Sequence, residues 1–208
     1  ILSISDNKVF AQLSGDGSYL WSNTTFSYSF NDKTEVILGN KNHYSNQIDQ
    51  LDYFYFDIAG YRKLTNHFSL GLSYRRSSSY KSEKWNPSNN YLSYFVYLAQ
   101  PGNIKIRCAT RFAYKTFETA ASQYGIDNIS TVDLFVKSNW HFPKPYVMDE
   151  VFTEIKTKRF QNIRLYGGLH IIKLKHIGFD FYYCYWKTHS GPAWNTFNVF
   201  GINTKVRI

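Results

Sequence analysis

Three observations in the sequence predict an all-β fold. Apolar residues occupy every second position over long stretches, as at Phe54, Phe56 and Ile58, which is the period of a strand with one apolar face. Aromatic residues make up 19% of the chain, whereas Ala is scarce and Met occurs once, a composition that favours strands over helices. Clusters of Asn, Asp, Gly, Pro and Ser separate the alternating runs and indicate turns.

Alternation and turn signals together divide the chain into about twelve candidate strands. The turn "KLTNH" divides the hairpin 53–76 into two arms, and "NDKT", "QPGN", "FPKP" and "LKH" separate other neighbouring runs. In order, the runs are 2–13, 20–30, 35–43, the two arms of 53–76, 91–99, 103–117, 129–141, 146–156, 162–173, 177–187 and 195–208. The first run alternates least clearly. An even strand count would place both ends of the chain on one side, which favours including 2–13, with ten strands as the alternative.

The connections between the runs alternate in kind. Short turns alternate with longer polar segments such as "YSNQIDQ", "SSSYKSEKWNPSNN" and "ETAASQYGIDN". This sorting is typical of an up-and-down antiparallel β-barrel of the outer-membrane type, and most runs exceed the usual strand length of about five or six residues. We therefore expect one transmembrane barrel domain over residues 1–208, in a bacterial outer membrane, with the C-terminus and short turns in the periplasm and the long loops outside.

The hydropathy of the chain fits this expectation. No stretch approaches the roughly 18 apolar residues of a membrane-spanning helix, and the mean hydropathy is −0.41. A membrane barrel is apolar only at alternate strand positions, so its average is polar. The alternative is a soluble sandwich, in which the apolar face would be the core.

The polar faces of the runs mix charges with tyrosines, which indicates a filled polar interior. In a membrane barrel these charges would face the lumen, where they must pair to offset desolvation. The expected lumen charge network is Asp57, Arg75, Lys105, Arg107, Arg111, Lys115, Glu150, Glu154, Arg164 and Asp180. Aromatic residues near run ends would form interfacial girdles. These are Trp21, Phe30, Tyr53, Trp140, Phe142, Tyr146 and Trp186.

The chain is basic, with 24 Lys and Arg against 15 Asp and Glu, a formal net charge of +9. Several cations lie toward the expected outer ends of the runs: Arg76, Lys81, Lys84, Lys158, Arg159 and Lys187. Membrane lipid head groups and phosphates of surface glycolipids are the natural partners of such a cationic rim. We expect no nucleic acid partner, because no recognition motif accompanies the charge.

The two cysteines, Cys108 and Cys184, lie on opposite kinds of face, so we expect two free thiols. The six His residues show no metal-ligand spacing, and we expect neither a metal nor a cofactor. The segment "HSGPAWN" supplies His189 and Ser190, but no third group that would complete a hydrolase triad. In "DEVFTE", Asp149 has the opposite parity to the two Glu residues, so we expect an interface, a bulge or a shift of the strand register at this position.

Three segments, "YRKLTNHFSLGLSYRR", "PYVMDEVFTEI" and "NIRLYGGLHIIKLKHIGFDFYYCYW", resemble a family of Bacteroidota outer-membrane proteins, the domain of unknown function 2490. The resemblance extends from about residue 20 to the C-terminus. Glu150 and Phe152 match the acidic-aromatic segment of the family, and Asn162 and Arg164 match the strand that follows it. The resemblance implies a barrel and an outer-membrane location, without a reaction or a ligand.

These features favour a non-enzymatic role. We expect a structural or accessory subunit of a cell-envelope complex, whose partners would be other outer-membrane or periplasmic proteins. Two alternatives remain open. One is a narrow channel for small solutes, with anion preference from Lys105, Arg107, Arg111 and Lys115. The other is an outer-membrane hydrolase that modifies lipids.

Overall fold

A computed structural model describes residues 18–45, 50–81, 83–118, 120–137, 143–190 and 193–208. These residues form eleven strands. The strands are β1 (Ser18–Asn31), β2 (Thr34–Tyr44), β3 (Leu51–Lys63), β4 (Phe68–Lys81), β5 (Lys84–Ala99), β6 (Lys105–Phe117), β7 (Gln123–Asp133), β8 (Lys144–Glu154), β9 (Arg159–Lys173), β10 (Ile177–Ser190) and β11 (Ala193–Arg207). Within the described residues, no helix is long and apolar enough to cross a membrane.

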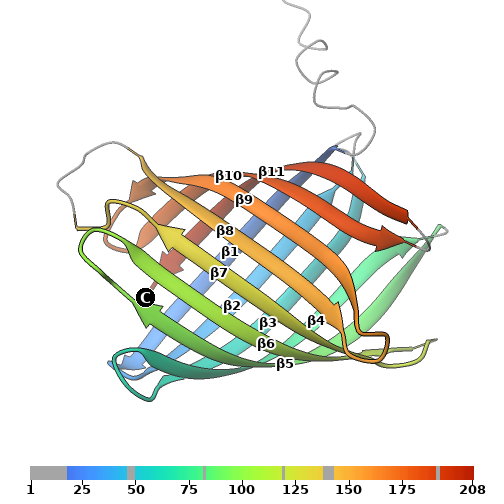
Figure 1. Cartoon of the computed structure of the whole chain (residues 1–208), viewed down its shortest axis with the longest axis horizontal. Coiled ribbons are helices and arrows are strands. Elements are labelled where there is room, and N and C mark those ends of the chain that lie inside the picture. The colour runs from blue at the N-terminus through green and yellow to red at the C-terminus, as the bar shows by residue number, and fades with distance from the viewer. Residues whose placement is uncertain (1–17, 46–49, 82, 119, 138–142, 191–192) are drawn as a thin grey trace, which may run out of the picture.

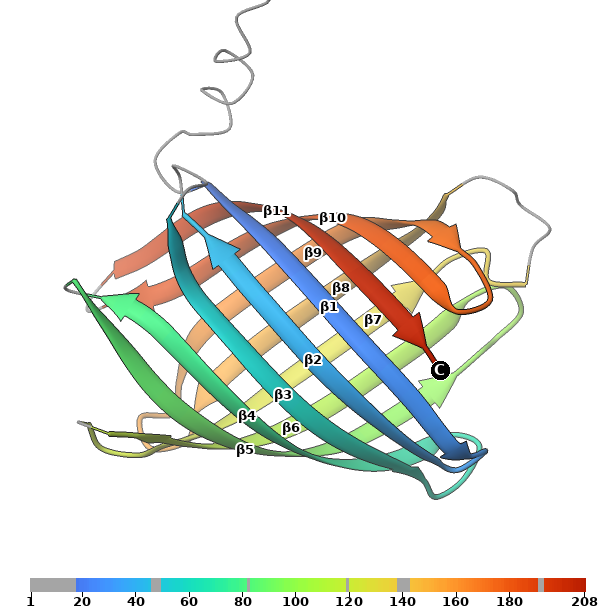
Figure 2. The same cartoon turned by 180° about the vertical axis from the view of Figure 1, so that it is seen from behind.

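The strands form one closed barrel in which each strand pairs with its neighbours in the chain (Figures 1 and 2). These ten pairings are antiparallel, and β1 and β11 close the barrel as a parallel pair, with Ser18 opposite Asn198 and Ser27 opposite Arg207. The all-β barrel expected from the sequence is confirmed. Eleven of the twelve expected runs correspond one for one to these strands, and the run 2–13 lies outside the described residues.

Different strand ends and connections form the two rims of the barrel. The C-terminal rim contains the end of β11 and the connections after β1, β3, β5, β7 and β9 (Figure 2). The opposite rim contains the start of β1 and the connections after β2, β4, β6, β8 and β10. The long polar segments expected as loops at the opposite rim mostly continue the strands, since β4 and β5 remain paired as far as Lys81 and Lys84. Connection length therefore does not distinguish the two rims.

Alternation gives the barrel an apolar outer face. Side chains of one parity point outward and remain highly exposed, including Leu72 at 71%, Phe56 at 60% and Leu165 at 51%. Their neighbours of the other parity are buried, such as Ser73, Leu92 and Tyr166. Because successive side chains on a strand point to opposite faces, one apolar set can cover the outside while polar residues line the inside.

The interior contains packed side chains. One cluster comprises Trp21, Tyr146, Tyr166, Tyr182, Cys184 and Val199, and a second comprises Leu92, Tyr94, Val96 and Ala109. Cys108 is exposed and Cys184 is buried, and both are free thiols, as expected. Toward the C-terminal rim, a cavity of about 320 Å³ is lined by residues that include Glu35, Tyr61 and Arg107.

Strand β7 begins and ends earlier than the sequence predicts. The expected run 129–141 is replaced by Gln123–Asp133, and the chain leaves the strand where Phe135 has a positive φ of 56°. In the sequence, Gly125 made the start of β7 look like part of a loop. In the structure Gly125 points inward beneath the ring of Phe152, where a Cβ atom would collide with the ring.

Inward-facing glycines also sit opposite tyrosines on neighbouring strands, and the Tyr ring covers the glycine in each case. The cross-strand pairs are Tyr61 with Gly71, Tyr146 with Gly168, and Tyr182 with Gly201. A glycine leaves room for a ring to lie against the strand, and the ring in turn protects the backbone.

Adjacent glycines in β9 provide a matched test of this packing. Gly168→Ala should destabilise the barrel by about 1–3 kcal/mol, because its Cβ would overlap the Tyr146 ring, which stacks on His170 at 4.7 Å. Gly167→Ala should be neutral or slightly stabilising, because no described atom beyond its two chain neighbours lies within 4 Å of its Cβ position. Urea unfolding followed by tryptophan fluorescence measures both; equal effects would contradict the packing role of the Gly168–Tyr146 pair.

Candidate functional site: the charge network inside the barrel

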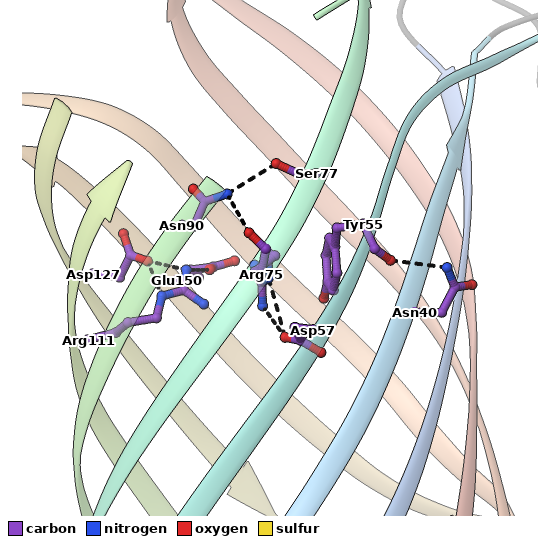
Figure 3. Close-up of polar contacts among 9 residues, drawn as sticks. All are labelled: Asn40, Tyr55, Asp57, Arg75, Ser77, Asn90, Arg111, Asp127 and Glu150. Atoms are coloured by element: carbon purple, nitrogen blue, oxygen red, sulfur yellow. Dashed lines mark hydrogen bonds and ion pairs between the residues drawn. The ribbon is translucent and has the colours of Figure 1, made fainter. Parts of the chain in front are cut away.

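A network of charged side chains crosses the middle of the barrel interior. Its members come from inward positions on β2, β3, β4, β6, β7, β8 and β9. They are Lys41, Asp57, Arg75, Arg111, Asp127, Glu150 and Arg164. Figure 3 shows Asp57, Arg75, Arg111, Asp127 and Glu150. Residues so far apart in the sequence meet because the closed sheet turns every inward side chain toward one interior.

Glu150 is shared by two arginines. Its Oε1 accepts a hydrogen bond from Arg111 Nη2 at 2.9 Å, and its Oε2 accepts one from Arg164 Nη1 at 2.9 Å. Arg111 also pairs with Asp127, whose side chain is only 2% exposed. Charge-assisted bonds of this kind offset the cost of removing the ions from water.

Aromatic rings complete the environment of Arg164. Its guanidinium carbon lies 5.2 Å from the ring centroids of both Trp21 and Trp186. Arg guanidinium groups interact favourably with aromatic faces at such distances. The ring of Trp21 also stacks on His43, with centroids 4.1 Å apart.

Arg75 and Asp57 form a second ion pair in the same layer. Arg75 Nη2 donates to Asp57 Oδ2 at 2.8 Å, and the guanidinium carbon lies 3.8 Å from the centroid of the Tyr55 ring (Figure 3). Asp57 occupies the space above Gly39 on β2, where a Cβ would collide with its carboxylate. Lys41 differs from these groups: its ammonium lies 4.0 Å from the Trp21 centroid, and no ion pair joins it to a described carboxylate.

A separate cluster lies nearer the C-terminal rim and includes Asp180. His170 contacts Asp180 through Nδ1 at 2.7 Å and Asp133 through Nε2 at 3.2 Å. Lys205 Nζ donates to Asp180 Oδ2 at 2.5 Å. This cluster joins β7, β9, β10 and β11, so it links strands next to the parallel closure of the barrel.

The structure therefore divides the ten residues expected to form one network. Asp57, Arg75, Arg111, Glu150 and Arg164 lie in the central layer, and Asp180 belongs to the His170 cluster. The remaining four lie elsewhere on the inner face. Lys105 is opposite Asp133, Arg107 lines the cavity at the C-terminal rim, Lys115 lies over the Phe117 ring, and Glu154 accepts hydrogen bonds from Thr157 and Gln161.

The expected network omitted several inward residues, among them Asp127 and Lys41 of the central layer and His170 of the Asp180 cluster. Asp127 was assigned to a loop because β7 was expected to start at residue 129, although Asp127 shares the parity of Ile129 and Asp133. Lys41 and His170 alternate correctly within expected runs, but their parity alone did not indicate their partners. The alternation of inward and outward positions along each strand, applied to every charged residue, would have placed these residues inside the barrel.

Several aromatic residues expected in interfacial girdles face the interior instead. Trp21 is fully buried, Tyr146 is 6% exposed, and Trp186 packs against the buried aromatic cluster. Tyr53 contacts His43 at 4.7 Å between ring centroids. Their strand parity, which matches that of the charged residues, overrides their position near run ends. Phe30 is 63% exposed, whereas Trp140 and Phe142 lie outside the described residues.

The expected cationic rim lies toward the opposite rim of the barrel. Lys81, Lys84, Lys158 and Arg159 occupy the ends of β4, β5 and β9 or the connection before β9, and all four are exposed. Arg76 donates to Asn89 and pairs with Glu118 at 3.0 Å. Lys187 lies in the last part of β10, 5.7 Å from the Tyr185 ring.

The structure places the residues that the sequence singled out for metal binding or hydrolysis as follows. No group of three His, Cys, Asp or Glu in this part of the chain could hold a metal ion. His189 packs edge-on against Trp194, with ring centroids 5.2 Å apart, and the side chain of Ser190 lies outside the described set. Asp149 does not lie at a bulge: it occupies a regular outward position midway along β8.

A closed sheet with an apolar outer face and a charged, aromatic interior defines a β-barrel protein. The family model described as "Protein of unknown function (DUF2490)" matches residues 19–197, which extend from β1 into β11. The chain belongs to this family. Neither the curated proteins nor the solved structures contain a match to the chain.

Glu150 and Glu154 allow a matched test of the central network, because both are inward glutamates on β8. Glu150→Gln should destabilise the barrel by about 3–5 kcal/mol, since Arg111 and Arg164 would lose their shared carboxylate. Glu154→Gln should cost less than about 1 kcal/mol, because the donors to Glu154 among the described residues, Thr157 and Gln161, are uncharged and no described cation depends on its carboxylate. Equilibrium urea unfolding gives both values, and similar losses for the two variants would argue against a central role for Glu150.

Proposed function

We propose that this chain is an integral β-barrel of a bacterial outer membrane that serves as a non-enzymatic structural or accessory subunit of a cell-envelope complex. The observation that carries the proposal is the apolar outer face, with Phe56, Leu72 and Leu165 among its exposed residues. Soluble proteins rarely expose an apolar surface of this extent, whereas a membrane barrel requires one.

The packed interior supports a structural role over transport. Barrels of about eight strands are filled by side chains and much larger ones leave an aqueous channel, so eleven strands permit either outcome. Here the central layer is crossed by ion pairs that involve Arg75, Arg111 and Arg164, each also close to an aromatic ring. A rigid barrel with a filled interior is suited to holding partners in the membrane.

The proposed orientation places the C-terminal rim in the periplasm and the opposite rim at the cell surface. The cations Lys81, Lys84, Lys158 and Arg159 would then meet the phosphates of surface glycolipids. The motif order that resembles the Bacteroidota family supports a Gram-negative envelope as the setting. Contacts to other envelope proteins would use the outer wall or the connections.

A charge placed on the outer wall distinguishes a membrane from water as the surroundings. Leu72→Arg should destabilise the folded barrel by about 2–4 kcal/mol in lipid vesicles, because a cation near the middle of the lipid-facing wall is poorly solvated. Asn66→Arg, in the exposed turn between β3 and β4, is the control and should have little effect. If the barrel were soluble, Leu72→Arg would be as harmless as the control, and the membrane proposal would fail.

Two measurements on the unmodified protein test location and transport separately. Membrane fractionation and gel migration with and without boiling should show a heat-modifiable protein in the outer membrane, whereas a soluble protein whose migration does not change would contradict the proposal. Purified protein in planar bilayers should give no conductance steps, because the interior is filled. Anion-selective steps whose selectivity changes when the charge of Arg107 is reversed would establish the channel alternative instead.

A further inference from the structure

The apolar outer face is interrupted by a polar patch on β6, β7 and β8. This β6–β8 patch consists of Thr110, Asn128, Ser130 and Asp149. Thr110 is opposite Asn128, and Ser130 is opposite Asp149, so the four side chains are neighbours on one face. Thr110 Oγ1 donates to Asn128 Oδ1 at 3.1 Å. The exposed thiol of Cys108 lies beside the patch, opposite Ser130.

Asp149 makes this patch unusual for a wall that faces lipid. It lies midway along β8, between Ser130 on β7 and the exposed Leu165 on β9. Within the described part of the chain, its carboxylate has no hydrogen-bond or ion-pair partner. A carboxylate at this level would remain unsatisfied in hydrocarbon, so it calls for a donor from outside the chain.

A second polar patch lies on β1 and β2. This β1–β2 patch consists of Ser22, Thr24, Asn40 and Asn42, in which Ser22 is opposite Asn42 and Thr24 is opposite Asn40. Asn42 Nδ2 donates to Asn40 Oδ1 at 2.9 Å, and Asn40 Nδ2 donates to the carbonyl oxygen of Tyr55 at 3.0 Å (Figure 3). In this part of the structure, the Thr24 hydroxyl and the second amide hydrogen of Asn40 remain available as donors.

The two patches occupy opposite walls of the barrel at similar levels. Strands β3, β4 and β5 separate them on one side, and β9, β10 and β11 separate them on the other (Figures 1 and 2). Asn128 and Asp149 lie midway along β7 and β8, as Thr24 and Asn40 lie near the middle of β1 and β2. The intervening walls carry apolar residues at this level, such as Leu72 and Ile202.

We propose that a second copy of this chain covers each patch: the β6–β8 patch of one barrel binds the β1–β2 patch of the next. This inference rests on the proposed function, because it requires both barrels to lie in the same membrane. Thr24 and Asn40 donate to the Asp149 carboxylate of the neighbour, and the amide of Asn128 donates to the Asn42 oxygen. Small side chains such as Ser22, Thr24 and Ser130 allow two walls to approach closely.

The position of the patches determines the form of the assembly. A contact between two different surfaces of the same chain is head-to-tail, so each barrel can bind a neighbour on both sides. Because the two patches lie on opposite walls, successive copies extend in a row within the membrane plane. The chain itself supplies both complementary surfaces, which favours a second copy over an unrelated partner.

Disulfide cross-linking through the native Cys108 tests the contact. Thr24→Cys introduces a thiol in the β1–β2 patch, and a membrane-permeable oxidant applied to intact membranes should give a ladder of dimers, trimers and larger species. Ser93→Cys, an outward position on β5 between the patches, is the matched control and should give no ladder. Combining Thr24→Cys with Cys108→Ala should abolish every species above the dimer.

Asp149→Leu, added to Thr24→Cys, tests the chemistry of the contact and should reduce the species above the dimer at least tenfold. A ladder that is unchanged by Asp149→Leu, an equal ladder from Ser93→Cys, or no ladder in membranes that contain heat-modifiable barrel would overturn the head-to-tail proposal. The heat-modifiable monomer in the last case would leave the membrane function intact. Protein found in the soluble fraction would instead refute the proposed function itself.

Discussion

The carboxylate of Glu150, held between Arg111 and Arg164, is the contact on which the barrel interior depends. Eleven strands enclose more space than apolar side chains alone fill here, and charges inside a barrel are costly unless they are paired. Glu150 lets two arginines from β6 and β9 share one acid across the interior, while Asp127 holds Arg111 from the other side. Rings of Trp21 and Trp186 occupy the remaining space around Arg164. The result is an interior that is both polar and closely packed.

Much of this arrangement could be predicted from the sequence, because a strand has a strict period of two. Parity alone separates Phe56 and Leu72 from Asp57 and Arg75, and the expectation of a membrane barrel then places the apolar set outside and the charged set inside. The same rule, applied consistently, places Trp21 inside; the expectation of an interfacial girdle gave too much weight to its position near a run end. The start of β7 was obscured because Gly125 suggests a loop until its contact with Phe152 is known.

Other features could not be predicted because they arise from pairings between distant strands. Parity places Glu150 and Arg164 on the inner face, but only the register of the closed sheet shows that Arg111 reaches the same carboxylate while Asp180 joins His170. Strand number follows the same logic. An even count was favoured because it would place both chain ends on one side, whereas the parallel pairing of β1 with β11 lets the described residues close with eleven strands. Polar segments that resemble loops in the sequence extend the strands, because the neighbouring strand continues alongside and pairs with them, as β4 and β5 do as far as Lys81 and Lys84.

The parallel pairing of β1 with β11, the seam of the barrel, also affects the order in which the strands pair during folding. Its two strands lie at opposite ends of the described chain, whereas every other pair joins sequence neighbours that can form a local hairpin. Loop-closure entropy makes such a distant pairing the slowest to establish. The hairpins can therefore form and associate first, and the barrel becomes sealed only when the last strand reaches the first. Until then both strand edges stay open, so the seam is where an assembly factor, or an aggregating neighbour, would have its opportunity to bind.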